Sequence, residues 1–247
     1  MNITKLLKKI LRIKSDKYQE FVAITNQKIK LQKTFSQHGH EYLIMMLLGK
    51  MKSGYFVEFG AIDGITNSNT YYFEKFLGWD GILAEPAKKW HKKLKYNRNV
   101  HIETDCVFKE SNLALEFIET GKWKGGNTLI KYINSDNKKR IVSEKYLVRT
   151  ISLNDLLDKY KAPKHIEFIS IDTEGSELEI ISSFNFSEYS FSIICIEHNG
   201  SDQKRESIRK IFEQNQYMRL PLPISLTNID DWYVSEKVLE HYNDLQG

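Results

Sequence analysis

The stretch YFVEFGAIDG at residues 55–64 decides the fold class. Its first half is mostly apolar and aromatic, which is typical of a buried strand, and glycines at 60 and 64 follow at once. Glycine lets a backbone turn tightly and lets a ligand approach it closely. The spacing is G-x-x-x-G, not the G-x-G-x-x-G that holds a pyrophosphate. Because Glu58 and Asp63 flank the turn, we expect a ligand with cationic centres there.

Short apolar runs alternate with helical stretches on the C-terminal side of this motif. Besides 55–59, the runs typical of strands are 81–84, 100–104, 166–171 and 193–197, with a weaker hairpin near 220–226 and 231–234. The predicted helices are 68–77, 88–96, 153–160, 177–181 and 202–215. This alternation predicts a Rossmann-like α/β fold, with a mostly parallel sheet and helices on both faces.

The chain divides into a helical N-terminal extension at 1–35 and one α/β domain at 36–247. Residues 3–13 form an amphipathic face, which we expect to dock on the domain or on a second subunit in a homodimer. Contact with a membrane surface is the alternative. The stretch 109–150 contains three glycines and is expected to be an irregular insertion that faces the substrate.

The composition excludes several classes of protein. Hydrophobic residues make up 41% and charged residues 28%, which is ordinary globular usage. The longest apolar stretch, 42–48, is too short to span a membrane, so we expect a soluble, cytoplasmic protein. Cys106 and Cys195 fall in predicted strands and are expected to be buried thiols. The net charge of +4 is scattered, and no aromatic-flanked Asn-Pro-Pro follows Asp172, so nucleic acid is not the expected partner.

Carboxylates follow the predicted strands at the edge where open α/β sheets bind ligands. Glu85 ends the second strand, where Rossmann-type sites place the ribose ligand. Asp105 follows the third strand and is expected to accept from an adenine amino group, or else to cap the turn. Asp172 and Glu174 follow the fourth strand, and the fifth ends in a Glu-His-Asn sequence at 197–199. We expect Asp172, Glu174, Glu197 and His198 to converge there.

Several motifs in fixed order resemble the FkbM family of S-adenosylmethionine-dependent methyltransferases over about 36–199. They are SQ at 36–37 ahead of Glu41, VEFGAIDG at 57–64, SNT at 68–70, EK at 74–75 before GW at 78–79, AEP at 84–86, DTEGSE at 172–177 and EHN at 197–199. The resemblance implies a class I methyltransferase fold, with S-adenosylmethionine across the strand ends and transfer to a hydroxyl oxygen, often on a sugar.

The resemblance also implies which residues hold the cofactor. Glu58, Gly60 and Asp63 would hold its methionine end, Glu85 its ribose and Asp105 its adenine. The full set of expected cofactor contacts is Gln37, Glu58, Gly60, Asp63, Gly64, Asn69, Glu85, Asp105 and Asp172. The acceptor is a small molecule or glycan, and a nucleotide-sugar used for capsule or lipopolysaccharide synthesis is the working hypothesis.

Methyl transfer to a hydroxyl calls for a general base. His198 is the first candidate because its ordinary pKa lies near neutrality, with Asp172 or Glu174 as the alternative and a merely structural histidine as the other interpretation. A divalent metal held by Asp172, Glu197 and His198 is a further alternative that we do not favour. The pair His38 and His40 is expected to be surface-exposed, or else to close over the site as a lid.

Two other functions use the same fold. A nicotinamide-dependent sugar dehydrogenase is disfavoured because the G-x-G-x-x-G motif is absent. A non-catalytic module that binds a nucleotide or nucleotide-sugar is disfavoured because polar side chains crowd the strand ends. Transfer of label from the cofactor to an acceptor separates these alternatives.

Overall fold

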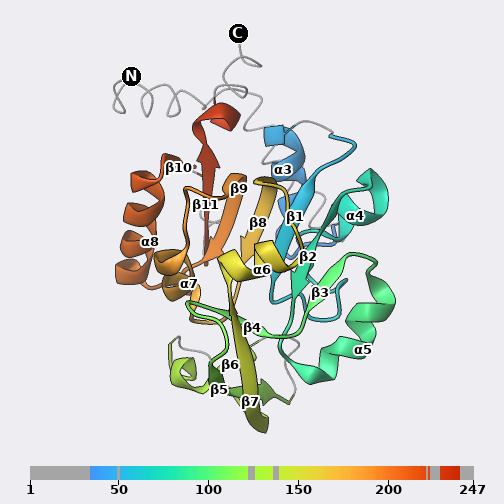
Figure 1. Cartoon of the computed structure of the whole chain (residues 1–247), viewed down its shortest axis with the longest axis vertical. Coiled ribbons are helices and arrows are strands. Elements are labelled where there is room, and N and C mark those ends of the chain that lie inside the picture. The colour runs from blue at the N-terminus through green and yellow to red at the C-terminus, as the bar shows by residue number, and fades with distance from the viewer. Residues whose placement is uncertain are drawn as a thin grey trace.

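The computed structural model describes residues 34–48, 51–121, 126–135, 139–220, 222 and 229–239. Its main sheet has seven strands in the order β10-β11-β9-β8-β1-β2-β3 (Figure 1). These strands are β1 (Tyr55–Phe59), β2 (Asp80–Ala84), β3 (His101–Glu103), β8 (His165–Ile171), β9 (Ser190–Glu197), β10 (Tyr217–Arg219) and β11 (Asp230–Ser235). The predicted extension at 1–35, with its amphipathic face at 3–13, lies outside the described residues apart from 34 and 35.

The sheet is mostly parallel, as predicted. Strand β1 pairs in parallel with β2 on one side and with β8 on the other, and β2–β3 and β8–β9 are also parallel. Among the described strands of this sheet, only β11 runs against its neighbours, β9 and β10. From β1 the chain adds β2 and β3 on one side, and β8 and β9 are added on the other side of β1. The order of the strands therefore reverses between β1 and β8, which is the point where open α/β sheets form a crevice for ligands.

Helices cover both faces of the main sheet because successive strand residues point to opposite sides. Phe56, Phe168 and Ile193 pack in one core cluster, together with apolar residues of α3 (His40–Leu48) and α4 (Tyr71–Leu77). The adjacent residues Val57 and Ile169 belong to the other cluster. That second cluster also holds apolar residues of α6 (Leu153–Lys159), α7 (Glu177–Ser183) and α8 (Asp202–Gln214). Both faces are therefore buried, and the predicted fold class is confirmed.

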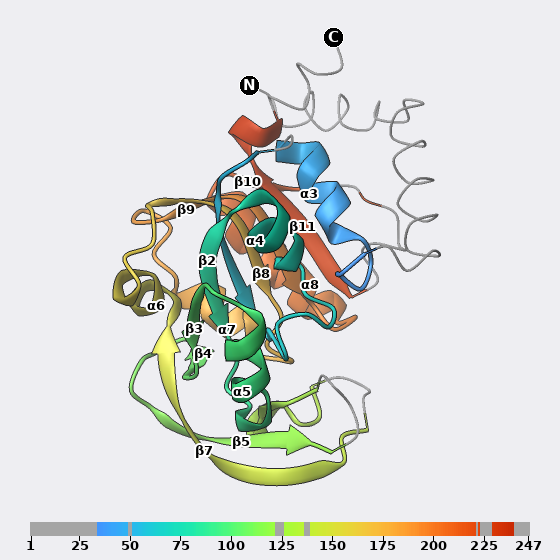
Figure 2. The same ribbon diagram turned by 90° about the vertical axis from the view of Figure 1, so that its right-hand side faces the viewer.

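The insertion at 109–150 is not irregular, which corrects the prediction. Its strands β5 (Ala114–Thr120), β6 (Thr128–Leu129) and β7 (Val142–Ser152) join β4 (Cys106–Phe108) in a second sheet of order β4-β7-β5-β6. A short 3-10 helix, η1 (Ile130–Tyr132), follows β6. In Figure 2 this sheet lies below the main one, beside α5 (Lys88–Asn97). Its own small core includes Phe117 and Val148, packed against Ala87.

Two boundaries differ from the predictions. Helix α4 begins at Tyr71, not at Ser68, because the Ser68 and Thr70 side chains turn back to the Glu58 carboxylate. Strand β10 lies at 217–219, ahead of the predicted 220–226, a range whose residues 221 and 223–226 are outside the described set. No helix in the described ranges is long and apolar enough to cross a bilayer.

Candidate active site

A pocket lies at the carboxyl ends of β1, β2 and β8, where the strand order reverses. Both sheets contribute to its lining, which consists of Phe59, Gly60, Ile62, Ala84, Glu85, Pro86, Cys106, Val107, Phe117, Gly126, Asn127, Leu129, Asp172, Thr173 and Glu174. Four predicted site residues, Gly60, Glu85, Asp172 and Glu174, are therefore brought together. The lining combines apolar side chains with three carboxylates, which suits a ligand that has both an aromatic ring and charged groups.

Gly60 ends β1 in a conformation that requires glycine. Its φ is +71°, and its amide donates to the Ala84 carbonyl oxygen at 3.0 Å. A Cβ built on Gly60 would lie 2.5 Å from the backbone oxygen of Asp172. The turn after β1 therefore passes directly against the end of β8, and a side chain would separate the two.

Replacing Gly60 with alanine is expected to destabilise the fold by about 1–3 kcal/mol, the usual cost of a left-handed non-glycine residue, and to weaken ligand binding in the pocket. Chemical denaturation and calorimetric titration with S-adenosylhomocysteine measure the two effects. Gly200→Ala is the matched control, because Gly200 has a φ of +70° but a Cβ built on it would meet no atom of the described residues within 4 Å. Equal binding losses in both variants would contradict the role assigned to Gly60.

Glu85 places a buried carboxylate in the pocket wall. Its two oxygens accept hydrogen bonds from the amides of Ile62 and Ala87, each at 2.8 Å. Burial raises the pKa of Glu85 to about 7, with Glu119 adding to the rise, while the two amides and the Lys89 ammonium act in the opposite direction. The carboxylate is held in one orientation and changes charge near neutral pH.

The Glu58 carboxylate faces away from the pocket, into a polar network. It accepts from the Ser68 hydroxyl at 2.9 Å, from the Thr70 hydroxyl at 2.5 Å and from the Asn69 amide nitrogen at 2.7 Å. The guanidinium of Arg98 lies 3.9 Å away. Glu58 thus fastens the segment before α4 to the end of β1, and its predicted contact with a cofactor stays a prediction.

Asp63 and Gly64 shape the turn without lining the pocket. Asp63 accepts from the amides of Ile65 and Thr66 at 3.1 and 2.8 Å. A Cβ on Gly64 would lie 2.6 Å from Arg98 Cγ, so glycine lets α5 pack closely here.

Three other predicted cofactor contacts also lie off the pocket wall. Asp105 forms an ion pair with Arg149 at 2.7 Å. Gln37 is exposed. Asn69 connects three elements, since its Oδ1 lies 2.9 Å from His40 Nδ1 and its Nδ2 donates to Ser170 Oγ at 2.9 Å. The structure does not bring these three side chains to the pocket that holds Gly60 and Glu85.

The acidic residues after β8 and β9 converge only in part. Carboxylate oxygens of Asp172, Glu177 and Glu197 lie within 4.8 Å of one another. Glu177, which we did not predict, accepts from the amides of Thr173 and Gly175 and pairs with Lys204. Glu174 pairs with Arg140 at 2.9 Å.

His198 lies off this acidic group and off the pocket wall. It is buried, its backbone amide donates to the Ile229 oxygen at 2.7 Å, and its Nδ1 accepts from the Gly200 amide at 3.1 Å. The bond between the His198 ring and the Gly200 backbone amide agrees with a structural role for this histidine. Its role as a base stays a prediction. His40, by contrast, is not a surface histidine: only 3% of it is exposed, which corrects that expectation.

The part of the pocket lining that the second sheet supplies was not predicted from the sequence. Phe117, Asn127 and Leu129 reach the pocket from β5 and from the segment that contains β6. A signal was present, because the run YLVRT at 146–150 is rich in aromatic and β-branched residues, as strands are. It was obscured by the glycines and the polar residues that precede it in the chain.

Comparisons with known proteins identify one family and several solved structures. The Methyltransferase FkbM domain matches residues 58–219, which is more than half of the chain. A precorrin-6y C5,15-methyltransferase from Geobacter metallireducens GS-15 is similar in structure, with a TM-score of 0.43, 11% identity and coverage of 76% of this chain and 75% of that chain. Methyltransferase FkbM from Methylobacillus flagellatus KT has a TM-score of 0.46 and 11% identity, and the match covers 74% of this chain and 44% of that chain.

A methyltransferase from Pyrococcus furiosus has a TM-score of 0.39 and 12% identity, with coverage of 78% of this chain and 80% of that chain. No curated protein matches the sequence. The family match extends from the end of β1 to β10, and so includes the pocket, the acidic group and the second sheet. The chain belongs to the FkbM methyltransferase family.

Proposed function

We propose that this methyltransferase uses S-adenosylmethionine to methylate a hydroxyl oxygen, on a sugar or nucleotide-sugar used for surface glycan synthesis. The observation that carries the cofactor assignment is the pocket at the reversal of strand order, where the bare backbone of Gly60 lies beside the Glu85 and Asp172 side chains. Carboxylates favour a cationic ligand, and a dinucleotide pyrophosphate would favour a barer, anion-binding turn.

The pocket residues fit the parts of S-adenosylmethionine. The apolar side chains of Val107, Phe117 and Leu129 would contact the adenine ring. The fixed carboxylate of Glu85 would accept hydrogen bonds from the ribose hydroxyls. Gly60 and Asp172 would receive the methionine end. When bound, the cofactor supplies an electrophilic methyl group on its sulfonium.

The protein's own contribution to transfer is to position the acceptor and to remove its proton. Asp172 and Glu174 line the pocket, whereas His198 does not. Glu174 is engaged by Arg140 in an ion pair at 2.9 Å, whereas Asp172 lies directly against the turn at Gly60, where a Cβ built on Gly60 would lie 3.9 Å from Asp172 Cβ. We therefore place Asp172 first as the base for the acceptor hydroxyl, ahead of Glu174 and His198.

Calorimetric titration with S-adenosylhomocysteine, with NAD as the control, tests the cofactor assignment. We expect micromolar binding of S-adenosylhomocysteine alone. Transfer of a labelled methyl group to a panel of nucleotide-sugars then tests the acceptor class. Binding of NAD alone would favour the dehydrogenase, and binding of S-adenosylhomocysteine with no transfer to any hydroxyl compound would contradict the proposed acceptor.

The pKa of Glu85 predicts a pH dependence. Because its folded-state pKa of about 7 lies above the ordinary 4.5, the folded chain holds more protons than the unfolded chain between these values. The contribution of Glu85 to stability therefore falls as pH rises from about 4.5 to 7. Affinity for S-adenosylhomocysteine should change in the opposite sense. It should rise through pH 7 as Glu85 ionises, because the carboxylate accepts hydrogen bonds from the ribose hydroxyls.

Glu85→Gln is the variant that tests this prediction. Losing a charged acceptor is expected to weaken S-adenosylhomocysteine binding by about 1.5–3 kcal/mol and to remove the rise in affinity through pH 7. Denaturation between pH 4.5 and 8 should show a flatter stability profile than that of the unmodified protein. Glu116→Gln, at an exposed ion pair on β5, is the control for the substitution itself. An unchanged affinity and profile in a folded Glu85→Gln protein would remove Glu85 from the ribose site.

A further inference from the structure

A second group of metal-ligating side chains lies on the α3 face of the main sheet. It consists of His40 at the start of α3, Cys195 in β9 and Asp230 at the start of β11. None of the three lines the pocket. Cys195 belongs to the core cluster on the α3 face, whereas Phe59 and Ala84 of the pocket wall belong to the opposite cluster. The group is therefore separate from the proposed cofactor site.

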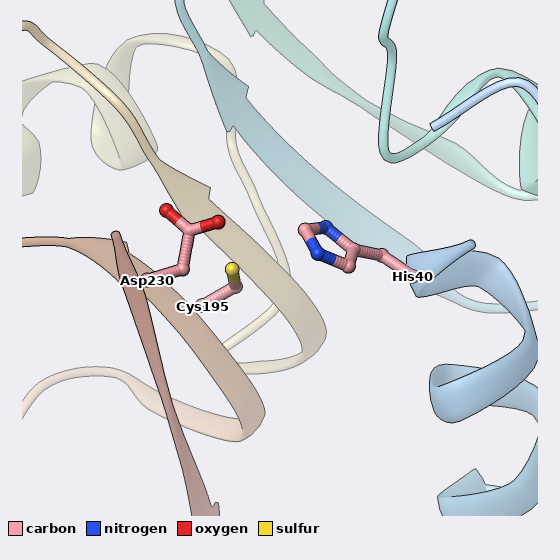
Figure 3. A group of neighbouring side chains, drawn as sticks. All are labelled: His40, Cys195 and Asp230. Atoms are coloured by element: carbon pink, nitrogen blue, oxygen red, sulfur yellow. The ribbon is translucent and has the colours of Figure 1, made fainter. Parts of the chain in front are cut away.

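The three side chains converge on one point. One ligand atom from each, a His40 ring nitrogen, the Cys195 sulfur and an Asp230 oxygen, lies within 4.8 Å of the other two. Figure 3 shows the His40 imidazole directed from the start of α3 toward Cys195 and Asp230. Zinc bonds of 2.0–2.3 Å in a tetrahedron separate ligand atoms by about 3.3–3.8 Å, so a shift of roughly 1 Å closes the site.

A second, independent observation that points to a metal ion is a ring nitrogen of His40 that has no partner among the described residues. Its Nδ1 lies 2.9 Å from the Asn69 side-chain oxygen, an acceptor, so Nδ1 carries the hydrogen and Nε2 carries a lone pair. Within the described ranges, that buried Nε2 has no hydrogen-bond partner. Burial, with a smaller contribution from the neighbouring His38, lowers the pKa of His40 to about 3, so the ring is neutral. Metal-bound histidines are oriented in the same way, with the second nitrogen donating to a fixed oxygen.

The charges around Cys195 favour a cation. Burial raises the pKa of the thiol well above its ordinary value, and the carboxylates of Asp230, Asp172, Asp231 and Glu197 raise it further. Asp231 is paired with Arg205 at 2.6 Å. A divalent cation would reverse this effect, because it stabilises the thiolate and the carboxylate together.

We propose that His40, Cys195 and Asp230 bind a divalent transition metal, with Zn²⁺ as the best match. The nitrogen, sulfur and oxygen set suits zinc, whereas Mg²⁺ and Ca²⁺ prefer oxygen ligands alone. The ion joins α3 to β9 and β11, three segments far apart in the chain, and three protein ligands leave its fourth position open. The site differs from the Asp172, Glu197 and His198 set considered from the sequence.

Titration of the chelator-treated full chain with Co²⁺ tests the proposal. A thiolate ligand to Co²⁺ produces a ligand-to-metal charge-transfer band, and Zn²⁺ added afterwards should remove that band. We expect one ion per chain, with a dissociation constant in the micromolar range or below, and a higher melting temperature with Zn²⁺. A chain that folds but shows no such band would overturn the proposal.

Variants assign the ligands. Cys195→Ser should remove the charge-transfer band and weaken Co²⁺ binding about 100-fold, and His40→Gln should weaken it to a similar extent. Cys106→Ser is the matched control: Cys106 is the other cysteine of the sequence, it is equally buried, and its substitution should leave the band unchanged. Asp230→Asn, at a less buried position, provides a third ligand variant if the two core substitutions impair folding.

The acidic group at Asp172, Glu177 and Glu197 is the competing location. Unchanged Co²⁺ affinity in folded Cys195→Ser and Asp230→Asn proteins would place the ion there and contradict the proposal. Loss of the band in Cys106→Ser, with retention in Cys195→Ser, would contradict it as well.

Discussion

Arg98→Ala is expected to lower the free energy of unfolding by about 3–5 kcal/mol, the usual result of removing one partner from a buried ion pair. The Arg98 side chain is fully buried and pairs with Glu74. It also donates to the Gly64 oxygen at 3.0 Å and to the hydroxyls of Ser68 and Thr70 at 3.1 and 2.9 Å. Its loss leaves the Glu74 and Glu58 carboxylates buried without this cation.

Urea denaturation measures the effect, with Arg209→Ala as the matched control. Arg209 pairs with Glu206 and Glu213 on the exposed side of α8, where such pairs contribute about 0.3–0.5 kcal/mol each. A loss in Arg98→Ala no larger than that in Arg209→Ala would show that the buried network does not hold the turn after β1. Because Arg98 contacts the segment 64–70, we also expect weaker binding of S-adenosylhomocysteine in the variant.

Asp172→Asn is expected to slow methyl transfer by about 10²–10⁴-fold, the usual contribution of a general base. The asparagine amide cannot take up the proton of the hydroxyl that receives the methyl group. The amide keeps the shape of the side chain but loses the charge that would face the methionine end, so the affinity for S-adenosylhomocysteine should fall, but by a smaller factor than turnover. Steady-state rates with the best acceptor of the nucleotide-sugar panel, together with calorimetry, separate the two effects.

His198→Ala is the comparison variant for this prediction. If Asp172 is the base, His198→Ala should alter stability more than turnover, because the substitution removes the buried Nδ1 that accepts from the Gly200 amide just after β9. The reverse result, with normal turnover in Asp172→Asn and a large loss in His198→Ala, would move the base to His198.

Predictions from sequence succeeded where the signal was local. The run at 55–59 is observed as β1 with the predicted bounds, because a continuous apolar run followed by glycine has few other stable conformations in an α/β protein. Gly60, Glu85 and Asp172 lie together because the carboxyl ends of parallel neighbours share one edge of a sheet. Each conclusion needed only residue type and order.

Sequence patterns could not show whether a given carboxylate binds a ligand or another group of the protein. Glu58 lies near the end of β1, Asp63 in the turn after it and Asp105 after β3, and each binds groups of the protein itself. Their predicted contacts with a cofactor stay predictions. A carboxylate at a strand end can bind a ligand or a neighbouring amide, and which one it binds depends on how the groups around it are placed in the folded protein. The residue pattern does not contain those positions.

The sequence by itself determined the α/β class, the main strands and helices and the family, because periodicity, turn glycines and motif order are properties of neighbouring residues. The tertiary structure alone decided which carboxylates face the pocket and that β4, β5, β6 and β7 form a second sheet, which adds apolar side chains to the pocket lining. It alone also decided that His40, Cys195 and Asp230 converge. These contacts join residues distant in the chain. They arise only when burial of both sheet faces brings those segments together.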